Sequence, residues 1–213
     1  MNELTCPSLG ETWLNLVHLT ITNGQPLQDE AVELLEARVG FPAQTEGDEL
    51  IMRFGDHRMV AAMERVFFAE GDGMLGHEYA SLMRGPEGRK DLADVISLLG
   101  KEPSSKRAVV TLCGQGGGKV PCVNVMQFLV RSDEVQTIYF ARGQDAYKKF
   151  YADALCIARL ARRVAEGVGR RAGKVTGFIG SSHVYNADRP AVAEFLSRGQ
   201  WFLQHPRSKA VTV

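Results

Sequence analysis

The chain has 213 residues, of which 45% are hydrophobic, and its 25 Lys and Arg residues balance 25 Asp and Glu residues to give a net charge of zero. This length suits a single globular domain, residues 1–213, with a sizeable core, and the neutral charge argues against a nucleic-acid-binding surface. No apolar run reaches the length of a membrane span, so we expect neither nucleic acid nor a membrane as a partner.

The first half of the chain contains four predicted elements. Apolar residues at helical spacing, with Ser8 as a cap, predict a helix over 8–23. Apolar residues among acids favour a second helix over 28–38, with an extended segment as the alternative. A strand is predicted over 48–54, followed by a helix over 59–69 that carries Glu64.

The sequence patterns in the second half of the chain predict helices, strands and a hairpin. The β-branched and aromatic runs 123–130 and 135–140 are parted by Ser132 and Asp133, which is typical of a hairpin. The remaining predictions, in chain order, are a loop over 71–76, a helix over 91–99, a strand over 108–113, a turn over 115–119, a long helix over 145–169, a strand over 174–183 and a helix over 190–196. The chain therefore predicts an α+β fold, a mixed sheet with helices packed against it.

The cysteines and the cationic clusters limit the site chemistry. The cysteines, at positions 6, 113, 122 and 156, have no paired metal-ligand spacing, so no metal is expected. The N-terminus lacks a signal pattern, which favours a cytoplasmic protein with reduced thiols. The clusters at 159–163 and 170–174 are interpreted as a solvated helix face and its C-terminal end rather than as a binding patch.

Cys122 is the candidate nucleophile, because it opens the first strand of the hairpin and Arg142 ends the second. A cation near a cysteine favours the thiolate that nucleophilic attack requires. The alternative is a buried and inert cysteine.

A series of residues, in order and at matching spacing, resembles the thymidylate synthase family. The match runs without a gap from Cys122 to Tyr185, and its residues are Pro121-Cys122, Gln127-Phe128, Arg142, Asp145, Asp153 and His183-x-Tyr185. Upstream, Ser105-Lys106-Arg107 resembles the family's Ser-Arg-Arg phosphate segment. Glu64 resembles its catalytic glutamate, and Tyr79 with Arg84 its Tyr-Gly-Lys-Gln-Trp-Arg segment.

The resemblance implies a set of roles. Cys122 would add to carbon 6 of a pyrimidine, which makes carbon 5 nucleophilic, while Glu64 positions the water network that moves protons. Tyr79 would join these two as a catalytic residue. Substrate binding would fall to Lys106, Arg107 and Arg142 at the phosphate, His183 and Tyr185 at the sugar, and Gln127 and Asp153. Asp145 would bind folate, with methylenetetrahydrofolate as co-substrate. The resemblance also implies a homodimer with shared active sites.

Departures from the family pattern point to the substrate. Asp153 stands where the family has an asparagine that reads uracil; a carboxylate cannot donate to O4, but it can accept from the exocyclic amine of cytosine. The same change separates the deoxycytidylate hydroxymethylases from the thymidylate synthases. Gly143 and Lys106 relax contacts beside the sugar and phosphate, so the substrate can be CMP or dCMP.

Two further departures concern folate and the base pocket. Lys149-Phe150-Tyr151-Ala152 replaces the family's Gly-Leu-Pro-Phe, and Val123 replaces the histidine that usually follows the cysteine. The sequence thus predicts a cytidylate C5-hydroxymethyltransferase that acts on a pyrimidine nucleoside monophosphate. The alternatives are thymidylate synthase acting on dUMP and a catalytically silent nucleotide-binding or interaction protein.

Overall fold

The fold is a mixed sheet with helices packed against it, as the sequence predicts. The computed structural model describes residues 2–28, 30–68, 79, 83, 92–112 and 120–205. The elements in these ranges are β1 (Asn2–Thr5), α1 (Leu9–Asn23), β2 (Gln25–Leu27), β3 (Ala31–Pro42), α2 (Glu49–Phe54), α3 (His57–Phe68), α5 (Leu92–Lys101), β4 (Val109–Thr111), β5 (Val123–Arg131), β6 (Glu134–Ala141), β7 (Gln144–Asp145), α6 (Phe150–Gly167), β8 (Arg171–Tyr185), the 3₁₀ turn η1 (Asn186–Asp188) and α7 (Arg189–Gln204).

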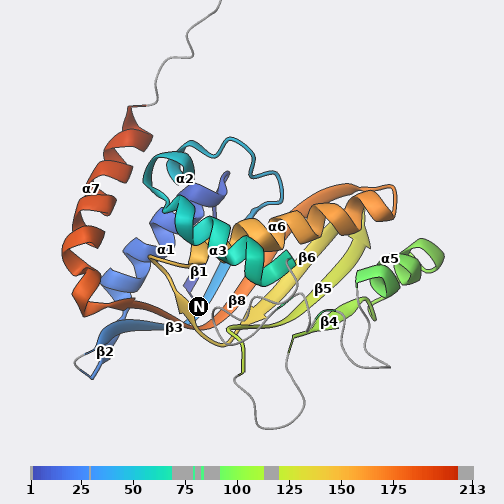
Figure 1. Cartoon of the computed structure of the whole chain (residues 1–213), viewed down its shortest axis with the longest axis horizontal. Coiled ribbons are helices and arrows are strands. Elements are labelled where there is room, and N and C mark those ends of the chain that lie inside the picture. Colours follow the sequence, from blue (N-terminus) through green and yellow to red (C-terminus); the bar gives the residue numbers. More distant parts are fainter. Residues whose placement is uncertain are drawn as a thin grey trace, which may run out of the picture.

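The described strands form one sheet in the order β1-β3-β8-β6-β5-β4, with β2 beside β3 and β7 beside β8. The sheet is mixed because β8 runs antiparallel to β3 but parallel to β6. Helices α1 and α6 pack on the sheet, and α3 packs beside α6 (Figure 1). Helix α7 lies at one end of the molecule and α5 near β4 at the other. The predicted loop over 71–76 and turn over 115–119 lie outside the described residues.

The hairpin that precedes the site is confirmed. Strands β5 and β6 pair antiparallel, from Val123 opposite Ala141 to Arg131 opposite Glu134. The two turn residues Ser132 and Asp133 have φ angles of 48° and 65°. Positive φ at both central residues defines a type I′ turn, whose twist matches that of the flanking strands. The turn therefore sets the register that places Cys122 beside the end of β6.

The predicted helix over 28–38 is wrong, since this segment contributes to the long strand β3. β3 pairs with β8 from Ala31 to Pro42. Glu36 has a φ of 57° and interrupts the ladder, so the strict apolar alternation of a strand is lost. Leu34 and Leu35 then stand together as in a helix, although Leu34 is buried and Leu35 is 58% exposed.

The predicted strand over 48–54 is also wrong, because these residues form the short helix α2. The Asp48 carboxylate accepts the backbone N–H of Ile51 at 3.2 Å and that of Gly10 at 2.7 Å. The first bond is an N-cap, and the second ties the helix start to α1. A six-residue helix is too short to display helical periodicity.

The long helix predicted over 145–169 begins five residues later, at Phe150. Asp145 belongs to β7, and its Oδ1 accepts the N–H groups of Tyr147 and Lys148 at 3.1 and 2.9 Å. These bonds favour a turn over a helical start at this aspartate. Asp145 is thereby held beside the C-terminal part of β8, just beyond the end of β6.

Trp13 joins three helices in the core. Its ring centroid lies 4.3 Å from that of Tyr151 in α6 and 4.3 Å from that of Phe195 in α7. The indole N–H donates to the carbonyl oxygen of Tyr147 at 3.1 Å, so its polar group is satisfied inside the core. The turn before α6 is thus packed on one side by α1.

The cationic clusters are largely paired with acids. Arg162 pairs with Glu46 at 2.9 Å, and Arg170 pairs with Asp133 at 2.9 Å. This pairing agrees with a solvated helix face and helix end. None of the helices within the described ranges has the length and apolar character that a bilayer crossing requires.

Candidate active site

Cys122 and Arg142 lie together at the mouth of the hairpin. The backbone N–H of Arg142 donates to the carbonyl oxygen of Cys122 at 2.9 Å. The Arg142 guanidinium donates to the carbonyl oxygens of Val120, at 2.8 Å from Nη2, and of Pro121, at 3.2 Å from Nε. Arg142 therefore braces the two residues before the cysteine while its side chain remains exposed.

The cation alone does not make Cys122 a thiolate. Burial is the largest cause that raises the pKa of the half-buried Cys122 thiol, and the nearby charge of Asp153 adds to it. Arg142 and Lys149 act in the opposite direction but do not offset these causes. The sequence-based expectation that Arg142 would favour the thiolate is thus half correct, because the cation is near but outweighed.

Asp153 is the most perturbed described acid in this region. It lies in the first turn of α6, is 3% exposed, and accepts a hydrogen bond on Oδ2 from Gln144 Nε2 at 2.8 Å. Its Oδ1 is buried and has no hydrogen-bond partner among the residues that the structure describes. Burial raises the pKa of Asp153 from 3.8 to about 6, although the bond from Gln144 favours the charged form. A buried oxygen in this state is rare in native structures, and it makes Asp153 a candidate functional residue.

Sequence reasoning missed Gln144. Its residue type, between Gly143 and Asp145, carries no pattern that distinguishes it from a surface glutamine. In the structure Gln144 is 2% exposed, because the short strand β7 joins the sheet beside Ser182 of β8. A polar residue at the start of the turn that leads into α6 was the available signal.

Tyr79 lies beside the cysteine. Its hydroxyl oxygen accepts the backbone N–H of Val123 at 3.0 Å, and its ring packs on Phe67 with centroids 4.4 Å apart. The side chain is 1% exposed, and burial raises the pKa of its phenol, with Asp153 as the next cause. The structure therefore places Tyr79 with Cys122 and Asp153. Its predicted companion Arg84 lies outside the described residues.

Asp145, His183 and Tyr185 form a second group next to the first. β7 pairs with β8 so that Asp145 is opposite His183, and the charge of His183 lowers the pKa of Asp145, although burial raises it more. The rings of His183 and Tyr185 meet edge to face with centroids 5.2 Å apart. The structure thus brings the predicted folate and sugar residues together at the C-terminal end of β8.

Lys106, Arg107 and Gln127 lie apart from Cys122. Gln127 Nε2 donates to the backbone oxygen of Lys106 at 2.8 Å, and Arg107 pairs with Glu102 at 2.6 Å. Gln127 is five residues beyond Cys122, a distance of roughly 15 Å along an extended chain. The predicted phosphate segment is therefore not beside the cysteine of the same chain.

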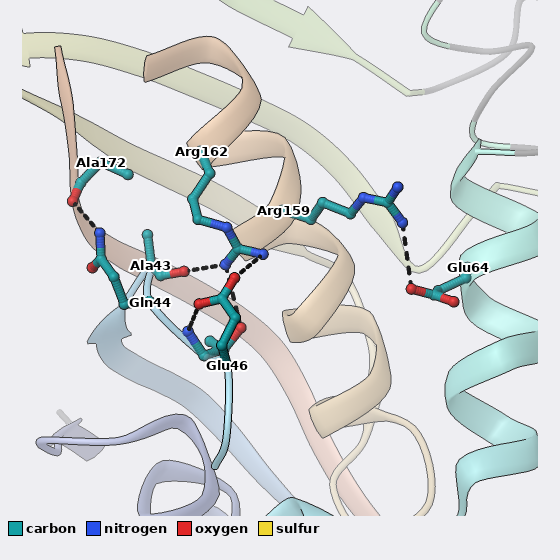
Figure 2. Close-up of polar contacts among 8 residues, drawn as sticks. Ala43, Gln44, Glu46, Glu64, Arg159, Arg162 and Ala172 are labelled. Carbon is teal, nitrogen blue, oxygen red and sulfur yellow. Dashed lines mark hydrogen bonds and ion pairs between the residues drawn. The ribbon is translucent and has the colours of Figure 1, made fainter. Parts of the chain in front are cut away.

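Glu64 also lies away from Cys122. It extends from α3 toward the outer side of α6, where its Oε1 is 3.4 Å from Nη1 of Arg159 (Figure 2). Both side chains are more than half exposed, so the pair is weak. One turn further along α6, Arg162 donates to the carbonyl oxygen of Ala43 at 2.5 Å and pairs with Glu46.

Together, the fold and this group define a class of protein. The mixed sheet with a helix lying across it, and a cysteine at the start of β5, is a thymidylate synthase-like α+β fold. The family model described as Thymidylate synthase matches residues 22–209, and the chain belongs to that family. It is a family of transferases that bind a pyrimidine nucleotide and use methylenetetrahydrofolate as co-substrate.

Several curated relatives carry the family name. A protein of Methanothermobacter marburgensis, named "Putative thymidylate synthase", is 23% identical over 220 residues, which cover 92% of this chain and 99% of that protein. The thymidylate synthase of Listeria monocytogenes is 27% identical over 145 residues, 64% of this chain and 46% of that protein. The chain thus spans the whole archaeal relative but aligns with less than half of the bacterial one.

Within the described ranges, no cluster of three or more His, Cys, Asp or Glu side chains is arranged to hold a metal ion. The Asp145 carboxylate is a hydrogen-bond acceptor, and this chemistry fits the folate-binding role. Its Oδ1 is occupied by its own turn, and no described residue donates a hydrogen bond to its Oδ2. An ionised carboxylate oxygen in this position can accept an N–H of a pterin ring.

Proposed function

We propose that the chain is a cytidylate C5-hydroxymethyltransferase, in which Cys122 bonds to C6 of CMP or dCMP so that C5 can take up a one-carbon unit. Once C5 has lost its proton and tetrahydrofolate has left, water would add to the methylene group on C5, and the Cys122–C6 bond would break to release the 5-hydroxymethyl product. The observation that carries this proposal is Asp153, a buried acid with one unpartnered oxygen beside the cysteine. Its carboxylate can accept from the exocyclic amine of cytosine, and its protonated form can also donate to N3. In the same pose uracil presents an N3–H donor to that proton and O4 to an acceptor oxygen, so the protonated acid favours cytosine.

The chain's own residues supply the remaining steps. Bound methylenetetrahydrofolate provides the electrophilic one-carbon unit. Because burial raises the pKa of Cys122, its thiol must lose a proton as sulfur adds to C6, and Arg142 and Lys149 favour the resulting charge. Glu64 would order the water that accepts and returns protons at the ring. His183 and Tyr185 would hold the sugar, and Arg142 the phosphate.

The proposed assembly is a homodimer that shares its sites. On the sheet face opposite α6, Phe140 of β6 and Phe178 of β8 pair across the ladder and are 42% and 41% exposed. Arg38 of β3 lies over the Phe178 ring at 5.6 Å. Exposed aromatic rings on a sheet face suit burial against a second copy. The separation of Arg107 from Cys122 supports a site completed by the partner's phosphate segment.

The test is a product assay. The purified chain is incubated with methylenetetrahydrofolate and one of CMP, dCMP, UMP or dUMP, and the products are scored for hydroxymethyl or methyl pyrimidine and for dihydrofolate. The proposal expects 5-hydroxymethylcytidylate without dihydrofolate. Methylated uridylate with dihydrofolate would identify a thymidylate synthase instead. No product from any of the four would indicate a catalytically silent homologue.

Asp153→Asn tests the base assignment directly. The amide can donate to O4 and accept from N3–H, so the preference should move from cytidylate toward uridylate. A buried unpaired polar group costs roughly 1 to 3 kcal/mol, so the ratio of kcat/KM values should change about tenfold or more. An unchanged ratio would remove Asp153 from base reading.

A further inference from the structure

A neutral carboxylic acid is an ambiguous reader of pyrimidines. Cytosine presents an acceptor at N3 and a donor at its amine, whereas uracil presents a donor at N3 and an acceptor at O4. An acid with one protonated oxygen can match either base with two hydrogen bonds, depending on which oxygen carries the proton. An ionised carboxylate makes one good contact and one repulsive contact with each base. Selectivity therefore depends on the position of a single proton.

Gln144 makes the two oxygens of Asp153 different. The Gln144 Nε2 donates to Oδ2 at 2.8 Å. A proton on Oδ2 would clash with the hydrogen that Gln144 donates if both lay on the same side of this oxygen. Oδ1 is buried and has no hydrogen-bond partner within the described residues. When Asp153 is protonated, the proton therefore resides on Oδ1, while Oδ2 remains an acceptor.

The backbone around Gln144 holds this arrangement. β7 pairs with β8 through the backbone, with Gln144 opposite Ser182 and Asp145 opposite His183. The backbone N–H of Asp153 donates to the carbonyl oxygen of Lys149 at 3.0 Å in the first turn of α6. Because both partners are almost fully buried in regular elements, neither side chain has room to exchange the roles of the two oxygens.

We infer that Gln144 is a positioning residue that fixes the proton of Asp153 on Oδ1 and thereby determines which pyrimidine the acid reads. This inference rests on the proposed function and deepens it. With Oδ1 facing N3 of the ring, the protonated acid donates to N3 of cytosine and accepts from the amine on Oδ2. In the same pose, uracil would point its N3–H donor at the Oδ1–H donor of Asp153, so uracil is rejected.

The charge state of Asp153 depends on its whole surroundings. The titratable or charged groups that interact with it are Tyr79, Cys122, Tyr139, Asp145, Lys149 and Cys156. Burial raises the pKa of Asp153 to about 6, and the Gln144 bond and Lys149 oppose this rise. Loss of the Gln144 donor should therefore move the titration of Asp153 to higher pH.

The experiment compares the parent with Gln144→Met, which keeps the length and apolar volume of the side chain but removes the donor. Dissociation constants for CMP and UMP are measured by calorimetry from about pH 5.5 to 8, without folate, so that binding is separated from chemistry. The ratio of the two constants cancels the titration of the nucleotide phosphate. Ser182→Ala is the matched control, since it removes a buried hydrogen bond one strand away that does not reach Asp153.

In the parent, the preference for CMP should weaken as pH rises and Asp153 loses its proton. Gln144→Met should lower that preference by about tenfold at the lowest pH and shift its pH dependence upward, while Ser182→Ala should leave both unchanged. Unchanged selectivity in Gln144→Met would overturn the inference. A pH-independent ratio in the parent would overturn it without any variant, should Gln144→Met fail to fold.

The same data separate this inference from the proposed function. A parent that prefers UMP refutes cytidylate recognition. If Gln144→Met then lowers the preference for UMP, the positioning role stands, with Oδ1 facing O4. A parent that prefers CMP while Gln144→Met keeps the same ratio refutes only the role of Gln144.

Discussion

Two predicted site acids, Asp153 in helix α6 and Glu64 in the neighbouring helix α3, have opposite surroundings in the structure. Asp153 is 3% exposed, lies near Cys122 and has an unpartnered oxygen. Glu64 is more than half exposed and pairs with Arg159. Asp153 and Arg159 are six residues apart in the helix, which places them about 120° apart around its axis. The helix therefore separates the two acids by presenting different faces to them.

A match to a family position identifies the type of residue that stands there, but burial determines how that residue ionises. The environment of Asp153 perturbs its acidity before any ligand arrives. In its proposed role, Glu64 must first break its weak surface ion pair with Arg159 before it can act near the pyrimidine ring. Variants can test each side of this contrast.

The largest effect is expected for Cys122→Ser, at the buried side of the comparison. A hydroxyl is similar in size to a thiol but a far weaker nucleophile, so turnover should fall by about 10⁴-fold or more. Nucleotide affinity, measured by calorimetry, should stay within about threefold because no binding contact is removed. Turnover near the parent level would refute the covalent mechanism.

Glu64→Gln should reduce kcat by roughly 10³-fold if the glutamate moves to the ring during the reaction. The matched control is Arg159→Gln, which breaks the same ion pair but leaves the carboxylate intact. Its kcat should stay within about threefold of the parent. The kcat values of both variants are measured by steady-state kinetics. An equal loss of kcat in the two variants would mean that the ion pair, and not the glutamate itself, supports activity.

The acidity of Asp153 should appear in the pH dependence of stability. Its pKa of about 6 exceeds the ordinary value of 3.8, so between these values the folded state binds more protons than the unfolded state. The free energy of unfolding should therefore fall as pH rises from about 4 to 6, by up to about 3 kcal/mol, and this contribution should level off above about pH 7.

Urea denaturation across that range, for the parent and for Asp153→Asn, isolates this group. The difference in unfolding free energy between the two proteins should change with pH in the stated direction, while Asp145 and the other acids cancel. A difference that does not vary between about pH 4 and 7 would mean that Asp153 is not perturbed in the folded protein.

The smallest effect concerns the exposed phosphate segment. If Arg107 completes the partner's site, Cys122→Ser and Arg107→Ala subunits are each impaired alone, but their hybrid contains one intact site. Random mixing should then recover about a quarter of the parent activity. Native mass spectrometry verifies that hybrids form. Absence of recovery in confirmed hybrids would place Arg107 in its own subunit's site.

Much of the fold could be predicted because its signals are local. The hairpin turn at Ser132 and Asp133, the Ser8 cap and the apolar face of α6 each depend on neighbouring residues. The errors have nonlocal causes. Glu36 adopts positive φ in the middle of β3, and Asp48 caps a helix too short to show periodicity. Neither feature leaves a clear pattern in the sequence.

The sequence predicted Cys122, Asp153 and Tyr79 as site residues from residue types and spacing, and the structure places these three close together. The bond between Gln144 and Asp153 was not predictable, because it depends on a two-residue strand that only the assembled sheet creates. The orientation of Glu64 was equally inaccessible, since it depends on Arg159 from a helix 95 residues later.

Trp13 gives the molecule an optical property. Its indole contacts Tyr151, two residues before Asp153, and donates to Tyr147, two residues after Asp145. The other tryptophan, Trp201, is 59% exposed at the far end of α7. With Trp201→Phe, the fluorescence of the protein would come from one buried indole that touches both sides of the turn before α6. Its emission should then change when a nucleotide or folate occupies the proposed positions, without any added label.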